Sequence, residues 1–448
     1  MNSKKPITPR ILPRYISLIC LIILTTFSFA QQQKIELIAS GKFSSIEARN
    51  VSVAAVSDDA YVVTYSSSQH NHASMVVLGI RNGSDIEFYG EKALFEGQHI
   101  SSLQTISLNK SQVVAIGQFA SGGRQYPVVA LIEVDIKNKK INVPYDKGLQ
   151  NSTKGFDKFA AAYIKDYTIG LVYYVNETRE LFATAIDVSP VGSEYYFSDG
   201  KHVLIQKGII DQLDVCGFKT GMYYYDPRGM VISYSDDSKN DEGFVQSMKV
   251  DRYEIEKESI TEPKKFTDFM GAFDITRVSD QDFVVAYEDI DGNVSLTNGS
   301  LAKGSVTINN KPNKSLNSTC SKVKAKGVGK NGTIITLLDE SGNVLDNYFG
   351  ITWSTEFIKA EPVQANKVNS VSVDYPKQFE INNFGFAYGG SDEGKLYIAK
   401  FPYKLQNFRF QDSGKEEEKY KGKYDPKYEK EVQDSKYKTK DPSYEKSK

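Results

Sequence analysis

Two carboxylates spaced for metal binding, Asp289 and Asp291, stand in the stretch DFVVAYEDIDGNVSL, residues 282–296. Calcium takes oxygen ligands, and a helix-loop-helix calcium loop has glycine at its sixth position and glutamate at its twelfth. Counted from Asp289, Gly292 stands at position four and Ser300 at position twelve. Because Asp-Gly and Gly-Asn supply residues that tolerate a positive φ, we predict a hairpin turn. A calcium site on Asp289 and Asp291 is the alternative.

Histidine offers little further metal chemistry. The four histidines are His70, His72, His99 and His202. His70 and His72 could lie on one side of a strand as part of a metal site, but no third ligand is evident, so we predict a solvated polar loop. The sequence also lacks the glycine-rich phosphate loop, the Gly-x-Ser-x-Gly nucleophile motif and the His-Glu-x-x-His zinc motif.

Three cysteines limit the covalent chemistry. Cys20 lies in an N-terminal segment that we expect to be removed, which leaves Cys216 and Cys320. At most one intramolecular disulfide could then form, and a cysteine-rich zinc site is excluded. The alternative for both residues is burial as small hydrophobic side chains.

The two ends of the chain differ in composition from the body. Residues 1–30 begin with basic residues, continue with an apolar run at 16–29 and end on Ser-Phe-Ala, which predicts a signal peptide cleaved before Gln31. The apolar run is shorter than the roughly 20 residues of a membrane-spanning helix. Residues 411–448 are rich in Lys, Glu and Tyr, with Val432 their one aliphatic residue. Such a tail is expected to be disordered.

The body, residues 31–410, should be a secreted or extracellular glycoprotein. Ten Asn-x-Ser/Thr triplets would be glycosylated on surface loops in a eukaryotic cell, or they reflect composition alone. They begin at Asn50, Asn82, Asn109, Asn151, Asn176, Asn293, Asn298, Asn313, Asn317 and Asn331. The body is mildly acidic in a chain of net charge −1, which argues against nucleic acid or an anionic membrane as a partner. No second apolar run predicts a membrane span.

One pattern recurs along the body: a strand-like run, a polar Ser-Asp turn and a second apolar run that closes on tyrosine. It is clearest in VSVAAVSDDAYVVTYSSS from Val51 and FDITRVSDQDFVVAYEDI from Phe273. The residue that closes the second run marks seven copies, 50 to 61 residues apart: Tyr65, Ile116, Tyr173, Tyr234, Tyr287, Leu337 and Tyr388. A period of this size is typical of a repeat architecture.

The first copy divides into four short runs rich in β-branched and aromatic residues, and no long stretch of the chain has helical periodicity. The pattern resembles secreted seven-bladed β-propeller repeat proteins over residues 35–410. This resemblance implies an all-β chain: a seven-bladed β-propeller of four-stranded antiparallel blades, with a disordered C-terminal tail. Propellers protect their sheet edges by circular repetition. The alternative fold is a pair of β-sandwich domains.

The resemblance also implies a binding face, because propellers commonly bind at the loops that follow their second strands. Acids in these loops include Asp236, Asp237, Glu288, Asp339 and Asp392, which we call the acidic rim. Gathered by the ring, they would form a negative surface able to hold calcium or steer a cationic partner. The alternative is that they are soluble turn residues.

Two classes of function follow. The favoured one is a non-enzymatic binding or scaffold propeller, secreted or on the cell surface, with an extracellular protein or glycan as partner and with no assigned catalytic or cofactor-binding residue. The alternative is a glycan-cleaving enzyme of glycosidase or sialidase type. Such an enzyme needs a carboxylate pair or a Tyr-Glu nucleophile and usually aromatic platforms, and Trp353 is the only tryptophan. Fold alone does not decide between them.

Overall fold

The computed structural model describes residues 34–67, 73–96, 98–121, 124–149, 155–191, 194–218, 228–251, 253–302, 304–309, 315–328, 332–351, 357–376 and 382–402. These residues belong to one compact unit. Their regular structure is β, apart from two 3-10 helices, η2 (Asp237–Lys239) and η3 (Lys257–Ser259). The predicted all-β class is therefore confirmed. The signal peptide and the tail lie outside the described residues and stay predictions.

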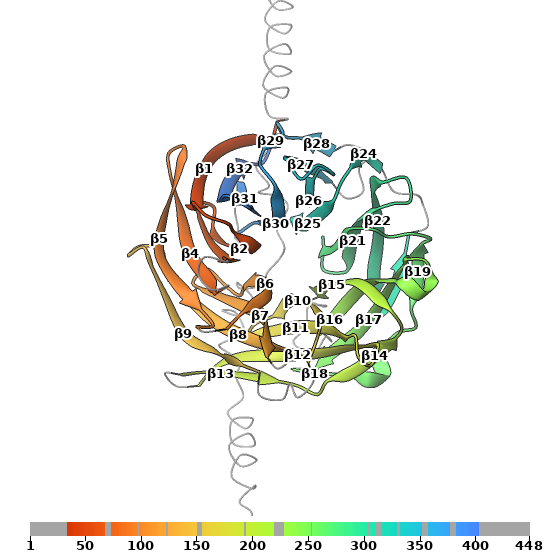
Figure 1. Cartoon of the computed structure of the whole chain (residues 1–448). Helices are drawn as coiled ribbons and strands as arrows, with labels where there is room; N and C mark the ends of the chain where they lie inside the picture. Colours follow the sequence, from red (N-terminus) through yellow and green to blue (C-terminus); the bar gives the residue numbers. More distant parts are fainter. Residues whose placement is uncertain are drawn as a thin grey trace, which may run out of the picture. The chain divides into compact units, whose positions relative to one another are not determined.

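Five small antiparallel sheets follow one another along the middle of the chain (Figure 1). The first contains β6 (Ile100–Ser107), β7 (Gln112–Ser121), β8 (Arg124–Asp135) and β9 (Lys140–Gly148). The second contains β10 (Lys158–Lys165), β11 (Thr168–Val175), β12 (Glu180–Val191), β13 (Glu194–Asp199) and β14 (Val203–Lys207). The third contains β15 (Ile210–Phe218), β16 (Arg228–Asp236), β17 (Glu242–Asp251), β18 (Glu254–Ile255) and β19 (Lys264–Thr267).

The fourth and fifth small sheets repeat this plan. The fourth contains β20 (Phe273–Arg277), β21 (Asp282–Glu288), β22 (Asn293–Ala302), β23 (Ser305–Ile308) and β24 (Ser315–Thr319). The fifth contains β25 (Lys322–Val328), β26 (Gly332–Leu338), β27 (Val344–Ile351), β28 (Phe357–Lys359) and β29 (Val363–Gln364). In the second to fifth sheets, the fifth strand pairs with the third, as the fourth strand also does.

One eight-stranded sheet joins the two ends of the body. One half of it contains β2 (Arg49–Ser57), β3 (Ala60–Ser66), β4 (Ser74–Asn82) and β5 (Asp85–Leu94), and the other β30 (Val368–Asp374), β31 (Asn383–Gly390), β32 (Gly394–Lys400) and β1 (Glu36–Ser44). N-terminal β1 pairs antiparallel with β32, and a single parallel bridge from Ser40 to Asp85 links it to β5.

The prediction of seven separate four-stranded blades was therefore wrong in its count. Five sheets stand alone, and hydrogen bonding through β1 makes the remaining strands one sheet. The propeller-like arrangement itself holds. The first strands of successive groups contact one another in a closed cycle, β2, β6, β10, β15, β20, β25, β30 and back to β2. Those labelled in Figure 1, such as β2, β10 and β25, lie around the centre of the body.

The second strands show why these sequences form sheets. β11 is buried along its whole length. Val172 and Tyr174 pack into one hydrophobic cluster, and Leu171 and Tyr173 into another. Because successive side chains point to opposite faces and both faces are covered, the strand is a continuous run of apolar and β-branched residues rather than an alternating one.

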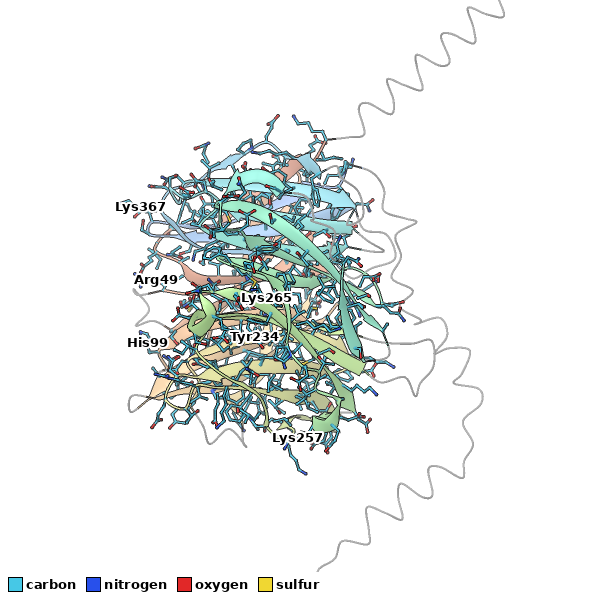
Figure 2. All side chains as sticks on the ribbon, turned by 90° about the vertical axis from the view of Figure 1, so that its right-hand side faces the viewer. Arg49, His99, Tyr234, Lys257, Lys265 and Lys367 are labelled. Atoms are coloured by element: carbon cyan, nitrogen blue, oxygen red, sulfur yellow. The ribbon has the colours of Figure 1, made fainter. Side chains whose placement is uncertain are left out.

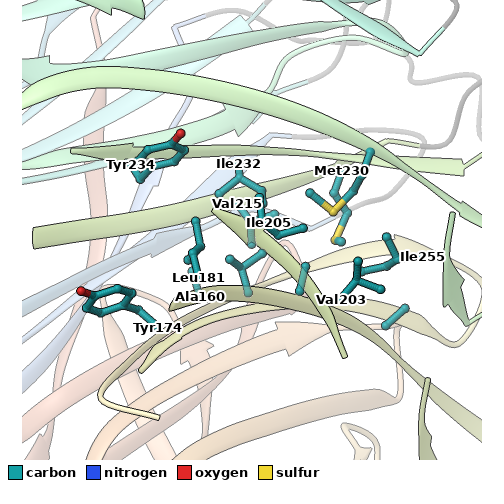
Figure 3. Packing of buried hydrophobic residues seen from close by; sticks show 14 of the residues in the cluster. Ala160, Tyr174, Leu181, Val203, Ile205, Val215, Met230, Ile232, Tyr234 and Ile255 are labelled. Atoms are coloured by element: carbon teal, nitrogen blue, oxygen red, sulfur yellow. The ribbon is translucent and has the colours of Figure 1, made fainter. Parts of the chain in front are cut away.

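The cores lie between neighbouring sheets. Figure 3 shows the cluster where β10–β14 meet β15–β19, with Leu181 and Val203 packed against Met230 and Ile232. Charged side chains such as Lys257 and Lys367 lie at the periphery of the body (Figure 2). Truncating one such buried side chain typically costs about 2 to 5 kcal/mol, so each cluster holds its two sheets together.

Strand register corrects one of the seven repeat markers. Phe159 pairs with Tyr173, and Phe273 pairs with Tyr287. In the first small sheet the corresponding Leu103 pairs with Gly117, not with Ile116. The chosen marker is therefore one residue early, which places it on the opposite face of its strand.

Candidate functional site

The turn between β21 and β22 is held by the Asp289 carboxylate. Its Oδ1 accepts hydrogen bonds from the backbone N–H of Asp291 at 3.1 Å and of Asn293 at 3.0 Å, and its Oδ2 accepts one from the Ser295 hydroxyl at 2.6 Å. Gly292 supplies a φ of 76°. These are the contacts of a turn.

The turn between β26 and β27 has the same chemistry. Asp339 begins the same Asp-x-x-Gly-Asn-Val sequence, and its Oδ1 accepts the backbone N–H of Asn343 and of Val344, both at 2.8 Å. Gly342 has a φ of 72°. Two sheets thus use aspartate to form a turn. Within the described ranges, no group of three or more His, Cys, Asp or Glu could hold a metal ion.

Two further members of the acidic rim also bind backbone. Asp236 is 2% exposed and caps η2, where its Oδ1 accepts the Ser238 N–H at 3.2 Å and the Ser238 hydroxyl at 2.5 Å. Glu288 is half-buried, and its Oε2 accepts the Ala272 N–H at 3.3 Å. These acids position their own loops.

Asp237 and Asp392, the last members of the acidic rim, are exposed. All five residues lie at or just after the end of a second or equivalent strand, as the repeat pattern predicts. Since the other three are buried or half-buried, Asp237 and Asp392 are the two of these five side chains that are open to a partner. The acidic rim is therefore mainly a set of turn formers, and we build no ligand site on it.

The glycosylation triplets fall in several environments. Asn82, Asn109 and Asn176 are exposed, and Asn50 and Asn293 are half-buried. Asn298 is 6% exposed on β22, so a glycan there would require its side chain to leave the sheet interior. The remaining triplets lie where no side chain is described: Asn151, Asn313, Asn317 and Asn331.

Cys216 and Cys320 are free and buried, so they do not form a disulfide. Cys216 packs in one hydrophobic cluster and Cys320 in another. Burial raises the pKa of the Cys216 thiol well above its usual range and that of Cys320 to about 12. Since the thiolate is the reactive form, both cysteines act as small hydrophobic side chains.

The innermost strands bring together three ionisable side chains that are far apart in sequence. The carboxyl group of Asp214 on β15 interacts with that of Asp274 on β20, and Lys324 on β25 places Nζ 2.8 Å from Asp274 Oδ1. Burial, and then the Asp274 charge, raise the pKa of Asp214 well above its usual range. Burial opposes charge on Lys324, but Asp274 and Asp214 raise its pKa.

Each acid of this pair also holds the next strand. Asp214 Oδ2 accepts the Ile275 N–H at 3.1 Å, and Asp274 Oδ2 accepts the Ala325 N–H at 2.6 Å. The pair therefore ties β15 to β20 and β20 to β25. We call Asp214, Asp274 and Lys324 the acid joint.

Polar residues make the same connection in other sheets. The Ser52 hydroxyl accepts the Thr105 N–H at 2.8 Å, and Gln104 Oε1 accepts the Ala161 N–H at 2.8 Å. Both lie on first strands, like the acids of the joint. Because uncharged residues do the same work there, linking first strands is sufficient reason for Asp214 and Asp274.

Half-buried tyrosines gather at one junction between sheets, where β6–β9 meet β10–β14. They are Tyr145, Tyr163, Tyr167 and Tyr195, which we call the tyrosine junction. The half-buried hydrophobic residues at the other described clusters include at most one aromatic each, and no tyrosine. Sequence reasoning missed this concentration, because the four residues come from three strands and a turn.

A hydrogen-bond network crosses the same junction. Gln112 Nε2 donates to the Tyr195 hydroxyl at 2.7 Å, and that hydroxyl donates to Glu133 Oε1 at 3.1 Å. Asn142 Nδ2 donates to Glu133 Oε2 at 3.2 Å. The network joins three strands of one sheet to β13 of the next.

His202 takes part in a second, deeper chain of contacts beside this junction. Its Nδ1 lies 2.6 Å from the Tyr173 hydroxyl and its Nε2 lies 2.9 Å from Asp199 Oδ2. Tyr173 is 2% exposed, and burial raises its pKa far above the usual range. A phenol this buried cannot reach a substrate, so the chain of contacts fixes β14 onto the sheet.

Comparisons with known proteins place the fold. No protein-family model matches the chain, and no curated protein does. The chain is similar to the BP39L lectin from Burkholderia pseudomallei, with a TM-score of 0.53 and 11% identity over 80% of this chain and 99% of that one. This likeness shows an all-β, propeller-like body, and at this identity it shows the fold alone.

Two other solved structures are more distant. An Aleuria aurantia lectin mutant in complex with Fucalpha1-6GlcNAc has a TM-score of 0.45 and 12% identity over 66% of this chain and 90% of that one. The Hadza microbial sialidase Hz136 has a TM-score of 0.45 and 8% identity over 78% of this chain and 74% of that one. At these scores neither supports a conclusion. No helix in the described ranges is long and apolar enough to cross a membrane.

Proposed function

We propose that this chain is a secreted or cell-surface glycoprotein that acts as a non-enzymatic binding propeller with a glycan ligand. One observation carries the proposal: the innermost acids are used to hold strands. Asp214 and Asp274 each accept a backbone N–H from the next strand.

The pair is engaged in holding strands: Asp214 Oδ2 accepts the Ile275 N–H, and Asp274 accepts the Ala325 N–H and contacts Lys324 Nζ. The fold likeness to a lectin supports binding as the function, and the tyrosine junction offers aromatic and polar groups that a glycan could contact.

A glycan-cleaving enzyme is the second candidate, and one observation favours it. The raised pKa of Asp214 keeps a neutral acid next to Asp274, and acid–base pairs in enzymes are commonly made by separating two pKa values in this way. A panel of aryl glycosides tests it. We expect no turnover above buffer. Turnover that the Asp274→Asn variant abolishes would establish the enzyme instead.

A further inference from the structure

We propose that the tyrosine junction is a saccharide-binding site. This inference rests on the proposed glycan-binding function and names its location. Small-molecule sites combine aromatic surface with a few placed polar groups, and this is the junction at which half-buried tyrosines and an amide–phenol–carboxylate network coincide.

The polar side of the site is set by strand register. Gln112 on β7 pairs with Glu133 on β8, and Glu133 pairs with Asn142 on β9. Side chains directly opposite in a sheet share a face, so the three form one row across the sheet. Tyr195 of β13 contacts this row through its hydroxyl.

The row has hydrogen-bonding capacity left for sugar hydroxyls. An ionised carboxylate has about four acceptor positions. Among the described residues, the contacts to Glu133 are the Tyr195 hydroxyl on Oε1 and the Asn142 amide on Oε2. Asn142 is exposed, and Glu133 and Gln112 are half-buried. These groups therefore reach solvent and offer both donors and acceptors, as polyhydroxylated ligands require.

The aromatic side of the site is held rigidly. Tyr145 of β9 stacks on Phe197 of β13, with ring centroids 4.4 Å apart and planes at 28°. Phe197 is 4% exposed, whereas Tyr145 is half-buried. Lys147 Nζ also lies over the Tyr145 ring, 5.6 Å from its centroid. Because the buried ring of Phe197 fixes that of Tyr145, Tyr145 can present an apolar edge to the C–H surface of a pyranose at little entropic cost.

One glycosylation triplet borders the site, so the glycosylation state of the protein affects the binding experiment. Asn109 Nδ2 donates to Gln112 Oε1 at 2.7 Å. An N-linked glycan on Asn109 would lie beside the row and compete with a free saccharide. The protein should therefore be produced with the full chain but without N-glycosylation.

A glycan array, followed by titration calorimetry with the best oligosaccharide, tests the inference. Tyr145→Ala and Glu133→Gln should each weaken binding by about tenfold or more, the scale expected for anchor residues. Tyr145→Phe keeps the ring and should bind within about threefold of wild type. Matched controls are Tyr253→Ala, in the turn between β17 and β18, and Glu242→Gln, at the start of β17. They change the same residue types away from the site and should leave the dissociation constant unchanged.

The possible outcomes distinguish failure of the proposed site from failure of the proposed function. Wild-type binding that survives both Tyr145→Ala and Glu133→Gln would overturn the site but leave the proposed function standing. No binding by the wild-type chain to any glycan would overturn both. Equal thermal unfolding midpoints for the variants and wild type exclude loss of fold as the cause, and Tyr145→Phe supplies a second check because it preserves the packing on Phe197.

Discussion

Asp214 and Asp274 stand 60 residues apart in sequence, yet their carboxyl groups interact on the innermost strands of the body. Two carboxyl groups in contact cannot both be charged without strong repulsion. The acid joint therefore retains a proton, and its stability must depend on pH.

Asp214→Asn should flatten that dependence. Burial and the Asp274 charge raise the pKa of Asp214, so the folded chain keeps a proton that the unfolded chain releases above its ordinary pKa of about 3.9. The free energy of unfolding should thus fall as pH rises from about 4 towards the raised pKa, and level off above it. Urea unfolding from pH 4 to 8 measures the difference between variant and wild type. If the free energies of unfolding of the variant and the wild type change with pH in parallel, the pKa of Asp214 is not raised in the folded chain.

Asp289 and Asp291 should differ sharply in their effect on stability. Asp289→Ala removes the acceptor of two backbone N–H groups and should cost about 1 to 3 kcal/mol. Asp291→Ala changes an exposed side chain and should stay within about 0.5 kcal/mol. Denaturant unfolding with and without calcium checks both values. A calcium-dependent gain that both variants lose would restore the metal site.

Local chemistry explains which residues could be read from sequence. The turn at Asp289 was predictable because Asp-Gly-Asn carries its own conformational preference. The acid joint and the tyrosine junction were not predictable. Each combines residues from separate sheets, and a local sequence pattern does not show how those sheets pack together. Tyr145 and Phe197, for example, meet only after two sheets have packed.

At the scale of elements, β1 closes the body by pairing with β32. Glu393 sits at this closure, where its carboxylate contacts Lys42 Nζ at 2.9 Å and accepts the Tyr388 hydroxyl at 2.7 Å. Although burial opposes it, these contacts and Lys395 lower the pKa of Glu393 to about 2. The ionised Glu393 carboxylate therefore stabilises the pairing of β1 with β32.

Glu393→Gln should loosen this closure, with a cost of about 1 to 3 kcal/mol at pH 7. A depressed pKa contributes stability above the unfolded value, near 4.3, and that contribution is lost as pH falls towards 2. The difference from wild type should therefore shrink between pH 5 and pH 2. Glu361→Gln, at an exposed ion pair with Lys34, is the matched control and should change little. An equal effect of both substitutions would contradict a special role for the closure.

Close approach between first strands gives a second test at this scale. A Cβ on Gly327 of β25 would collide with the Arg277 carbonyl oxygen of β20. Gly327→Ala should therefore destabilise the fold by about 1 to 3 kcal/mol through forced backbone movement. Gly148→Ala meets its nearest atom, Pro127 O, at 3.8 Å and should be tolerated. Thermal unfolding of the two variants compares them, and equal midpoints would show that the strands can separate freely.

Element prediction succeeded where a run was buried on both faces. β3, β11 and β26 were visible as apolar runs because each lies between covered faces. Register failed at Ile116, since an apolar run without alternation does not mark which residue faces which side. The pairing of Leu103 with Gly117 needed the assembled sheet.

At the scale of the whole molecule, repetition predicted an all-β, propeller-like body but not how its ends join. The repeat pattern treats each copy as an independent unit, whereas β1 bonds to both β32 and β5 and makes one eight-stranded sheet of two groups. A single parallel bridge, Ser40 to Asp85, creates that connection. The spacing of the repeats does not reveal such a contact between the first and last parts of the body.

The central claim is that this body holds glycans without cleaving them. The most direct measurement incubates the unglycosylated chain with the oligosaccharide selected on a glycan array, then recovers the ligand and identifies it by mass spectrometry alongside its dissociation constant. The account predicts saturable binding, weakened about tenfold by Tyr145→Ala, with the oligosaccharide recovered intact after prolonged incubation. Shortened products that accumulate with time and vanish in Asp274→Asn would contradict it, because the acid joint would then be a catalytic pair.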